Sequence, residues 1–234
     1  MQKVCLILVT LFNLASASTK TTSTAPALVP AVSPKNNSSS LSAVYDQLDL
    51  AKTGLQKDVF EYALRGWQKM KDARPVLSIV DLSQPSTKKR LYVVDLQKRK
   101  LLFNTYVSHG RNSGDVVAKK FSNINSSFQT SLGFYQTLNT YMGRHGLSLQ
   151  LKGLEKGFND NAYNRNIVLH GADYVCEDFI RKTGRLGRSQ GCPAVPNALS
   201  KDIILAVKGG SCLFVYSPDS HYLKKSAYLS NSNA

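Results

Sequence analysis

The sequence predicts a mainly β fold of the α+β type, with helices flanking the sheet. Short runs rich in β-branched and aromatic residues dominate the later chain, beginning with residues 76–82 and 90–96. Before these runs, residues 41–70 carry apolar side chains near helical spacing, and residues 199–207 place apolar side chains on one face of another helix. The hydrophobic content, 42%, is sufficient for one core in a chain of 234 residues.

Residues 1–17 have the pattern of a secretory signal peptide. A short basic end precedes an apolar stretch over residues 4–14, and residues 15–17 form an A-x-A cleavage site. The apolar stretch is too short for a membrane span, and Cys5 lacks the small residues that a lipoprotein cysteine needs before it. We therefore expect an exported protein with no stable membrane span once the signal is cleaved after Ala17.

Two segments separate the signal from the strands. Residues 18–40 are dominated by Ser, Thr, Ala, Pro and Asn, which bury too little apolar surface to order the chain, so we expect a disordered linker. A helical extension follows over residues 41–74, with a short helix, a break at residues 52–54 and a longer amphipathic helix from Leu55. Its apolar face is predicted to pack into the core, with a partner-binding surface as the alternative.

Residues 75–217 form the predicted main domain, followed by a polar tail. A polar turn at residues 97–100 joins two of the predicted strands as a hairpin, and residues 147–151 alternate apolar and polar side chains as a half-buried strand does. The predicted strands span residues 76–82, 90–96, 101–107, 131–137, 147–151, 167–169 and 211–216. The tail, residues 218–234, is expected to fray.

Cys192 is the candidate nucleophile. It follows Gly191 and precedes Pro193, a combination that puts it on a sharply turned backbone and displays it rather than packing it. Arg185 and Arg188 precede it closely, and positive charge favours the thiolate, which is the nucleophilic form. A buried structural cysteine is the alternative, which the glycine-cysteine-proline turn disfavours.

His170 is the candidate general base, because a free thiol is only slightly ionised at neutral pH. It ends the apolar run of residues 167–169, so we place it at the end of a buried strand. The interval to Cys192 has room for a short helix over residues 172–182 and a glycine-rich return. If the later helix begins at Pro196, its positive end lies near Cys192 and helps to hold a thiolate.

These residues carry a resemblance to a known family. The run from His170-Gly171 to the Ser-Gln-Gly-Cys of residues 189–192 resembles the signature of the YkuD-type L,D-transpeptidases, which are cell-wall enzymes. Gln190 replaces the usual histidine, and Pro193-Ala194 replaces the usual apolar residue followed by Asn or Arg. A divergent subgroup, the murein L,D-transpeptidase catalytic domains, is more similar still. The stretches that carry this closer resemblance are residues 108–110, 153–155, 159–162 and 188–193.

The resemblance implies a YkuD-like β-sandwich or barrel over residues 75–217 and an acyl transfer through a thioester. It implies that Cys192 attacks the carbonyl between an L-centre and a D-residue of a peptidoglycan stem peptide, and that His170 moves the proton. The carbonyl of Gly171 would orient the His170 ring. The backbone N–H groups of Gly191 and Cys192 are candidates for the oxyanion hole.

Four further residues are candidates for substrate binding. Arg188 either binds a substrate carboxylate or pairs with a protein acid, and Ser189 holds either the loop or the substrate. His109, in a second Ser-His-Gly sequence, either lines the cleft or is an ordinary loop histidine. His145, with Glu155 and the polar residues 159–161, suggests a metal, but the spacing fits no compact metal motif. We expect neither a metal nor a cofactor, and assign these residues to substrate shaping.

The cysteine count leaves pairing open. After cleavage of the signal the chain keeps Cys176, Cys192 and Cys212, an odd number, so at least one stays free or pairs between molecules. A bond between Cys176 and Cys212 would leave Cys192 as the lone thiol, whereas a bond from Cys176 to Cys192 would inactivate the enzyme until it is reduced. Cys176 and Cys212 are equally readable as small buried hydrophobic residues.

The charge of +15 suggests an anionic partner such as the cell-wall polymer, with simple solubility as the alternative. We expect a monomer of the periplasm or cell envelope that acts on peptidoglycan stem peptides. Nucleic acid is disfavoured by the export signal and by the lack of a recognised binding motif. Alternatives are an L,D-carboxypeptidase or another peptidoglycan hydrolase, a noncatalytic wall-binding protein, and a cysteine peptidase that cleaves proteins.

Overall fold

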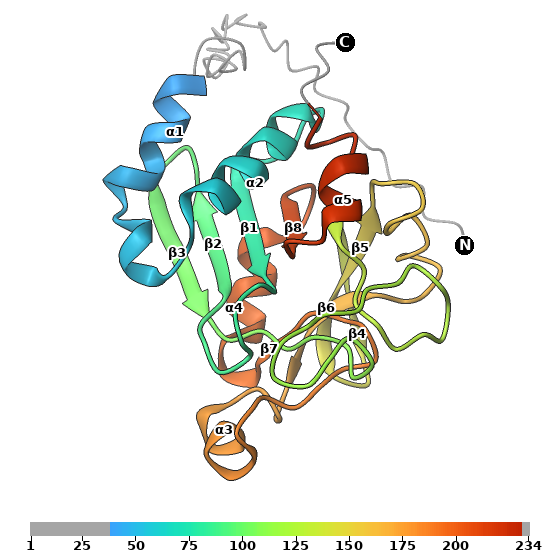
Figure 1. The fold of residues 1–234 in the computed structure, drawn as a ribbon. Coiled ribbons are helices and arrows are strands. Elements are labelled where there is room, and N and C mark those ends of the chain that lie inside the picture. Colours follow the sequence, from blue (N-terminus) through green and yellow to red (C-terminus); the bar gives the residue numbers. More distant parts are fainter. Residues whose placement is uncertain (1–37, 231–234) are drawn as a thin grey trace, which may run out of the picture. The chain divides into compact units, whose positions relative to one another are not determined.

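The computed structural model describes residues 38–230 (Figure 1). The predicted signal peptide, residues 1–17, lies outside the described residues, as does the predicted linker except for its last three positions. The helices are α1 (Ser38–Gln47), the 3-10 helix η2 (Leu50–Thr53), α2 (Lys57–Lys69), α3 (Glu177–Thr183), α4 (Asn197–Val207) and α5 (Ser220–Lys225). The strands are β1 (Val76–Asp81), β2 (Leu91–Asp95), β3 (Lys100–Thr105), β4 (Gly133–Gly143), β5 (Gly146–Gly153), β6 (Val168–Ala172), β7 (Ala194–Pro196) and β8 (Cys212–Tyr216).

One eight-stranded sheet organises the described residues, in the order β3-β2-β1-β8-β4-β5-β6-β7. Neighbouring strands are antiparallel except β1 with β8 and β6 with β7, which are parallel. Ser108, just beyond β3, bridges Ala194 in β7, so the two ends of the sheet meet and it forms a nearly closed barrel. The prediction of a mainly β fold with flanking helices is confirmed.

Helices cover the sheet on two sides. α2 contacts β1 and β8, whereas α4 contacts β1, β5, β6 and β7, and Figure 1 shows α2 in front of β1 with α4 behind it. The predicted helical extension is therefore part of the same packed unit, because Val44, Leu50 and Phe60 from its three helices are fully buried in the shared core. Burial on both sides explains why every residue of β1 and β2 is buried, without alternation.

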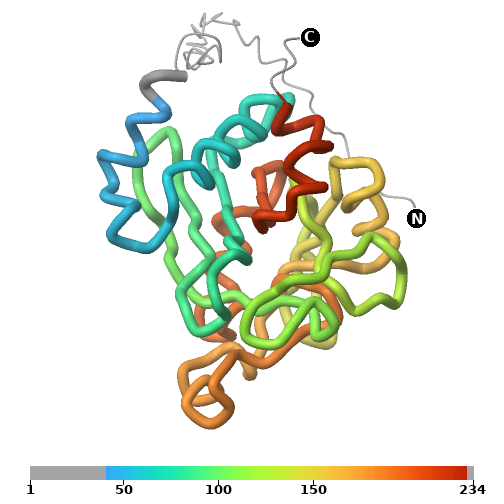
Figure 2. The backbone as a smooth tube through the Cα atoms, in the orientation of Figure 1, coloured from blue at the N-terminus to red at the C-terminus, as the bar shows by residue number. Residues whose placement is uncertain are grey.

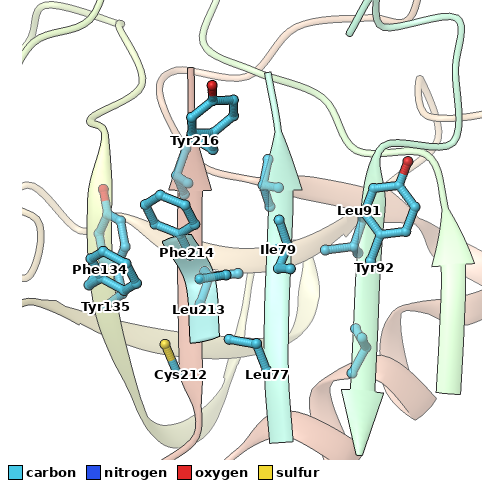
Figure 3. Packing of buried hydrophobic residues seen from close by; sticks show 14 of the residues in the cluster. Leu77, Ile79, Leu91, Tyr92, Phe134, Tyr135, Cys212, Leu213, Phe214 and Tyr216 are labelled. Atoms are coloured by element: carbon cyan, nitrogen blue, oxygen red, sulfur yellow. The ribbon is translucent and has the colours of Figure 1, made fainter. Parts of the chain in front are cut away.

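The core is tightest where α2 crosses the sheet. The rings of Phe134 and Phe214 stack with centroids 4.2 Å apart, on the neighbouring strands β4 and β8 (Figure 3). Gly66 in α2 lies directly over this pair, since a Cβ atom there would be 2.0 Å from the Phe134 ring. Glycine lowers helix stability by about 1 kcal/mol relative to alanine, so the close approach explains its place in the middle of α2.

Three expectations from the sequence were wrong in detail. The polar tail does not fray in the part that is described, because it forms α5 and buries Tyr222 completely. The helix expected over residues 172–182 is shorter, since α3 starts only at Glu177. Strand β7 was not predicted, because three residues that end in proline give no strand signal of their own.

The cysteines of residues 38–230 are all unbonded: Cys176, Cys192 and Cys212 are free thiols. Cys212 is fully buried on β8, in the row of apolar side chains that Figure 3 shows, and burial raises the pKa of its thiol far above the ordinary value. It therefore acts as a small hydrophobic residue, one of the alternatives given by the sequence. Among the same residues, the helices lack the length and apolarity to cross a bilayer.

Candidate functional site

The candidate nucleophile, Cys192, lies on a tight turn between α3 and β7. Ser189 Oγ donates to the Cys192 carbonyl oxygen at 2.6 Å and accepts the Gly191 N–H at 3.1 Å, so one hydroxyl holds both ends of the turn. Gly191 has φ +123°, a left-handed conformation that glycine tolerates and other residues resist. The turn leaves the Cys192 side chain half-buried. The sequence left two roles open for Ser189, and in the structure its hydroxyl holds the loop.

A second segment supports this turn through its main chain. Ser189 N–H donates to the His109 carbonyl oxygen at 3.0 Å, and Arg111 N–H donates to the Ser189 carbonyl oxygen at 2.8 Å. The two segments can be followed in Figure 2 as the green chain after residue 105 and the orange chain before residue 192. A Cβ atom at Gly110 would be 3.0 Å from the Gly191 Cα atom, so glycine at position 110 is what permits the approach. The Ser-His-Gly sequence thus contributes backbone to the site.

The His109 side chain is turned away from this site. It is 1% exposed, and its Nδ1 accepts from the Arg90 guanidinium at 2.8 Å, while Nε2 lies 3.3 Å from the Gly114 carbonyl oxygen. Burial, followed by the charge of Arg90, lowers the pKa of His109 to about 4, so the ring is neutral. His109 is not among the residues that line the pocket beside Cys192. The structure places it in a buried link between Arg90, just before β2, and Gly114 in the loop after β3.

His170 lies in β6, between β5 and β7. It is 4% exposed, and its Nδ1 is 2.8 Å from the Gly171 carbonyl oxygen. A carbonyl oxygen only accepts, so Nδ1 carries the proton and Nε2 presents a lone pair. Burial lowers the pKa of His170, and the charges of His145 and Arg144 lower it further, against the bond to Gly171, which raises it. The His170 ring is therefore neutral at pH 7.

Cys192 and His170 line one pocket of about 660 Å³. The Cys192 thiol donates a long hydrogen bond to the Asn166 carbonyl oxygen, with 3.7 Å between sulfur and oxygen. Burial raises the pKa of Cys192, although the backbone at Val168 and the charges of Arg165 and Arg144 oppose this rise. The resting residue is a neutral thiol, which requires a base before it can attack.

The electrostatic support expected from the sequence comes from other residues. Arg185 and Arg188, expected to favour the thiolate, instead pair with Asp115 Oδ1 at 2.6 and 3.2 Å. Neither arginine is among the charged groups that lower the pKa of Cys192. For Arg188 the contact with Asp115 is the alternative in which it pairs with a protein acid, although its side chain also lines the pocket.

The amino end of α4 lies where the sequence predicted it, with Pro196 just before the first turn. α4 begins at Asn197, after β7, and Asn197 Nδ2 donates to Asp173 Oδ1. A Cβ atom at Gly171 would lie 2.4 Å from Asn197 Oδ1, so the helix start packs against the strand that carries His170. The start of α4 thus contacts Gly171 in β6.

His145 is at the tip of the β4–β5 hairpin, over the base. Its ring stacks on the His170 ring, with centroids 4.5 Å apart and planes at 24°. Arg144 beside it donates from Nε to His145 Nε2 at 3.0 Å. Both residues line the pocket. The structure therefore brings His145 to the site, as a contact of the base.

Sequence reasoning missed Arg144 and Arg165 as residues of the site. Arg144 follows Gly143 in a hairpin turn, and nothing in the sequence indicates which side chains the turn will meet. Arg165 stands just before the predicted strand of His170, where a polar residue is ordinary and indicates no function by itself. A signal was present in its position, because residues next to a strand end that carries a catalytic group have a good chance of lining the same cleft.

One family of known proteins matches the chain. Residues 51–216 match the family described as the L,D-transpeptidase catalytic domain. No curated protein shows a significant sequence match to the chain.

Several solved structures are similar, at low identity. One is an L,D-transpeptidase from Mycobacterium smegmatis, with 14% identity, a TM-score of 0.37, and coverage of 61% of this chain and 59% of that one. L,D-transpeptidase 3 from Mycobacterium tuberculosis has 13% identity and a TM-score of 0.39, with 61% of each chain covered. The helical cell shape determining protein Pgp2 from Campylobacter jejuni, solved as a point mutant, has 16% identity and a TM-score of 0.41, with 66% of this chain and 54% of that chain covered. The chain thus spans less than two thirds of the length of these structures.

Proposed function

The chain belongs to the L,D-transpeptidase catalytic-domain family, and we propose that it is an exported cysteine acyltransferase that acts on peptidoglycan stem peptides in the cell envelope. The observation that carries this proposal is the shared pocket of Cys192 and His170. In it, a neutral thiol faces the same space as a neutral imidazole whose Nδ1 proton is held by Gly171. A nucleophile with a separate, oriented base is the arrangement that acyl transfer requires.

The reaction begins when the thiol leaves its long bond to Asn166 and gives its proton to His170 Nε2. Catalytic hydrogen bonds are often loose before substrate binds and shorten with it. Cys192 Sγ then attacks the carbonyl carbon of the bond between an L-centre and a D-residue. A tetrahedral intermediate forms, its C–N bond breaks, and His170 returns the proton to the leaving amine, which leaves a thioester on Cys192.

The second half transfers the acyl group. An amine of another stem, or water, attacks the thioester carbonyl, and His170 takes the proton of the attacking group. The C–S bond breaks and the proton returns to sulfur, so Cys192 is restored as a thiol. The amine gives a cross-link, whereas water gives L,D-carboxypeptidase or other hydrolase activity on the same substrate.

The negative charge of the intermediate needs donors aimed at the developing oxyanion. We assign this role to the backbone N–H of Cys192. The Gly191 N–H, the other candidate, donates to Ser189 Oγ at 3.1 Å and can contribute once a substrate oxygen competes for it. Ser189 then has a second function beyond holding the turn, because its hydroxyl competes with the substrate oxygen for the Gly191 N–H.

The test is turnover of a defined disaccharide tetrapeptide by the purified protein and by Cys192→Ala, followed by mass spectrometry of the products. Cross-linked dimer or tripeptide formed by the intact protein and absent with Cys192→Ala is the expected result. Dimer indicates transfer and tripeptide indicates hydrolysis.

A matched control distinguishes the effect of losing Cys192 from the effect of losing any other thiol. Cys176 is a partly exposed free thiol whose Sγ donates to the Asp173 carbonyl oxygen at 3.3 Å, outside the pocket. Cys176→Ala should keep full activity. Equal product from Cys192→Ala and the intact protein would refute the acyl-enzyme, and wall binding without any product would favour the noncatalytic alternative.

A further inference from the structure

The pocket beside Cys192 has a cationic wall. Arg144, Arg165 and Arg188 all line it, and among the described residues that line it there is no aspartate or glutamate. Three guanidinium groups without a carboxylate in the lining favour an anionic ligand. The three arginines are not equally free to bind one.

Arg165 is used to hold a loop. Its Nη1 donates to the Ser122 carbonyl oxygen at 2.7 Å and to Ser131 Oγ at 2.5 Å. Its Nη2 donates to the Gln129 carbonyl oxygen at 2.9 Å and to Ser127 Oγ at 3.2 Å. Both terminal nitrogens are thus engaged by the segment 122–131, and a ligand would have to displace them.

Arg188 is also engaged. Its Nη1 lies 3.2 Å from Asp115 Oδ1 and donates to the Gly114 carbonyl oxygen at 3.1 Å. Asp115 also pairs with Arg185, so this carboxylate offsets part of the positive charge that a ligand would meet at Arg188.

Arg144 differs from both. Its side chain is exposed, and its Nε donates to His145 Nε2 at 3.0 Å. Within residues 38–230, no protein group accepts from its two terminal NH₂ groups, and no acid pairs with it. Those two groups form the end of the planar fork, which binds a carboxylate with two parallel hydrogen bonds. Both terminal NH₂ groups of Arg144 are therefore available to an anion, whereas Nη1 of Arg188 and both terminal nitrogens of Arg165 are already bonded.

Arg144 is also close to the reacting groups. It is bonded to His145, whose ring stacks on His170 at 4.5 Å. Its charge lowers the pKa of His170 and that of Cys192. A ligand anion held by Arg144 would therefore lie on the side of the pocket where the base is.

We propose that Arg144 binds the terminal carboxylate of the D-residue that leaves the acyl donor, and so determines specificity for donors with a free carboxylate. This inference rests on the proposed function. In the first half of that reaction His170 gives its proton to the leaving amine, and in an amino acid one carbon separates the amine nitrogen from the carboxylate. A cation beside the base is thus placed where that carboxylate must lie, and the bond from Nε to His145 stays intact.

The kinetic test compares two donors, a disaccharide tetrapeptide ending in D-alanine and the same compound with a terminal carboxamide. Arg144→Gln is expected to lower kcat/KM for the carboxylate donor by about 10- to 100-fold, the range for loss of a hydrogen bond to a charged group, with little change for the carboxamide. Arg144→Lys should recover part of the loss, because it restores the charge without the fork. Lys152→Gln removes one charge from an exposed position of β5 outside the pocket and should leave both donors unaffected.

Binding to Cys192→Ala keeps the inference separate from turnover. Removal of the Arg144 guanidinium in this background should weaken binding of the carboxylate donor about 10- to 100-fold and leave binding of the carboxamide unchanged. If neither donor is turned over but this difference in binding is seen, the proposed function fails while the carboxylate site stands. Equal effects of Arg144→Gln on the two donors, or no effect on either, would refute the site.

Discussion

In the proposed reaction, the protonation states of Cys192 and His170 determine how the first step starts. Burial raises the pKa of the thiol and lowers that of the imidazole, so both side chains are neutral at pH 7. The resting site is therefore a thiol and an imidazole, and a preformed thiolate–imidazolium pair is not favoured. In the proposed reaction, proton transfer must then accompany the approach of the substrate. The orientation of His170 therefore determines whether the thiol can react.

The first prediction concerns pH. His170 must be unprotonated to act as base, and its pKa is lowered from 6.5. Activity should therefore rise with pH as His170 loses its proton, and kcat/KM should reach half of its plateau below pH 6.5. The measurement is a pH profile of kcat/KM for the tetrapeptide donor. An acidic limb centred well above pH 6.5 would mean that a thiolate, and not a neutral base, limits the rate.

The second prediction is that His170→Ala lowers kcat by about 10²- to 10⁴-fold, which is the usual contribution of a general base. His221, an exposed histidine of α5 outside the pocket, provides the control, and His221→Ala should keep the activity of the intact protein. Thermal unfolding of both variants establishes that each is folded. A fall of less than tenfold in a folded His170→Ala protein would contradict the assigned role.

Single residues were predictable where a local rule applies. Cys192 stands in a glycine-cysteine-proline turn and His170 follows an apolar run, so both could be picked from neighbours in the sequence. Arg144 could not, because its proposed role depends on the stacking of His145 on His170, a contact between the β4–β5 turn and β6. His109 stands in a Ser-His-Gly motif. The group that fixes its ring is the guanidinium of the buried Arg90, which donates to Nδ1 and lies 19 positions away in the sequence.

Among the elements, the loop after β3 packs closely against the turn that carries Cys192. A Cβ atom at Gly110 would be 2.5 Å from the Phe128 carbonyl oxygen and 3.0 Å from the Gly191 Cα atom. The third prediction is that Gly110→Ala displaces the turn of Cys192 and lowers kcat by about 10²-fold, since a displacement of about 1 Å in an active site has this effect. Steady-state kinetics with the tetrapeptide donor measure it.

Gly157→Ala is the matched control for this change. Gly157 has φ +82° with open space around it, so alanine there strains the backbone far from the pocket. It should lower the thermal midpoint without lowering kcat. If both variants lose kcat in proportion to stability, the effect of Gly110→Ala is not specific to the turn.

Elements were predicted well where their own residues determine them. The first two strands were expected at residues 76–82 and 90–96 and lie at Val76–Asp81 and Leu91–Asp95. β7 and α5 depend on partners: β7 exists through pairing with β6, and α5 docks because a distant carboxylate accepts from its side chains. A pattern within a short window carries no information on either partner.

At the scale of the whole molecule, Glu155 connects the C-terminal helix to the sheet. Its carboxylate accepts from the Phe134 N–H and the Tyr222 hydroxyl, each at 2.8 Å, and from the Ser226 hydroxyl. Glu155 is 4% exposed. Burial raises its pKa, although these three bonds lower it in part. One buried acid therefore links Tyr222 and Ser226 to the start of β4.

The fourth prediction follows from linkage. The pKa of Glu155 is higher in the folded protein than its ordinary value of 4.5, so between these two pKa values the folded state binds more protons than the unfolded state. The contribution of Glu155 to the free energy of unfolding should fall as pH rises through this window, by at most about 1.4 kcal/mol per pH unit. Glu155→Gln should remove this slope.

Denaturant unfolding at several pH values measures the difference in slope between the intact protein and Glu155→Gln. Glu61→Gln, on the exposed side of α2, removes the same charge and should retain the slope. Identical slopes for the intact protein and Glu155→Gln, or a difference of opposite sign, would contradict the raised pKa.

The class of the fold was accessible from the sequence, since runs of β-prone residues bounded by helices leave few other solutions. The pattern of β-prone residues does not by itself predict the closure of the sheet. This closure depends on a bridge from Ser108 to Ala194, between segments that each lack a strand signal at that point. The same bridge aligns the loop after β3 with the turn of Cys192, so the feature that completes the fold also builds the site.

The most direct test of the account is to find where the acyl group is attached. The intact protein is mixed with the disaccharide tetrapeptide, quenched in acid within the first turnovers, digested, and mapped by mass spectrometry. We predict a thioester of the disaccharide tripeptide on the peptide that contains Cys192, absent from the peptides of Cys176 and Cys212. Product formation with an adduct on another cysteine, or with no adduct while Cys192→Ala remains active, would contradict the central claim.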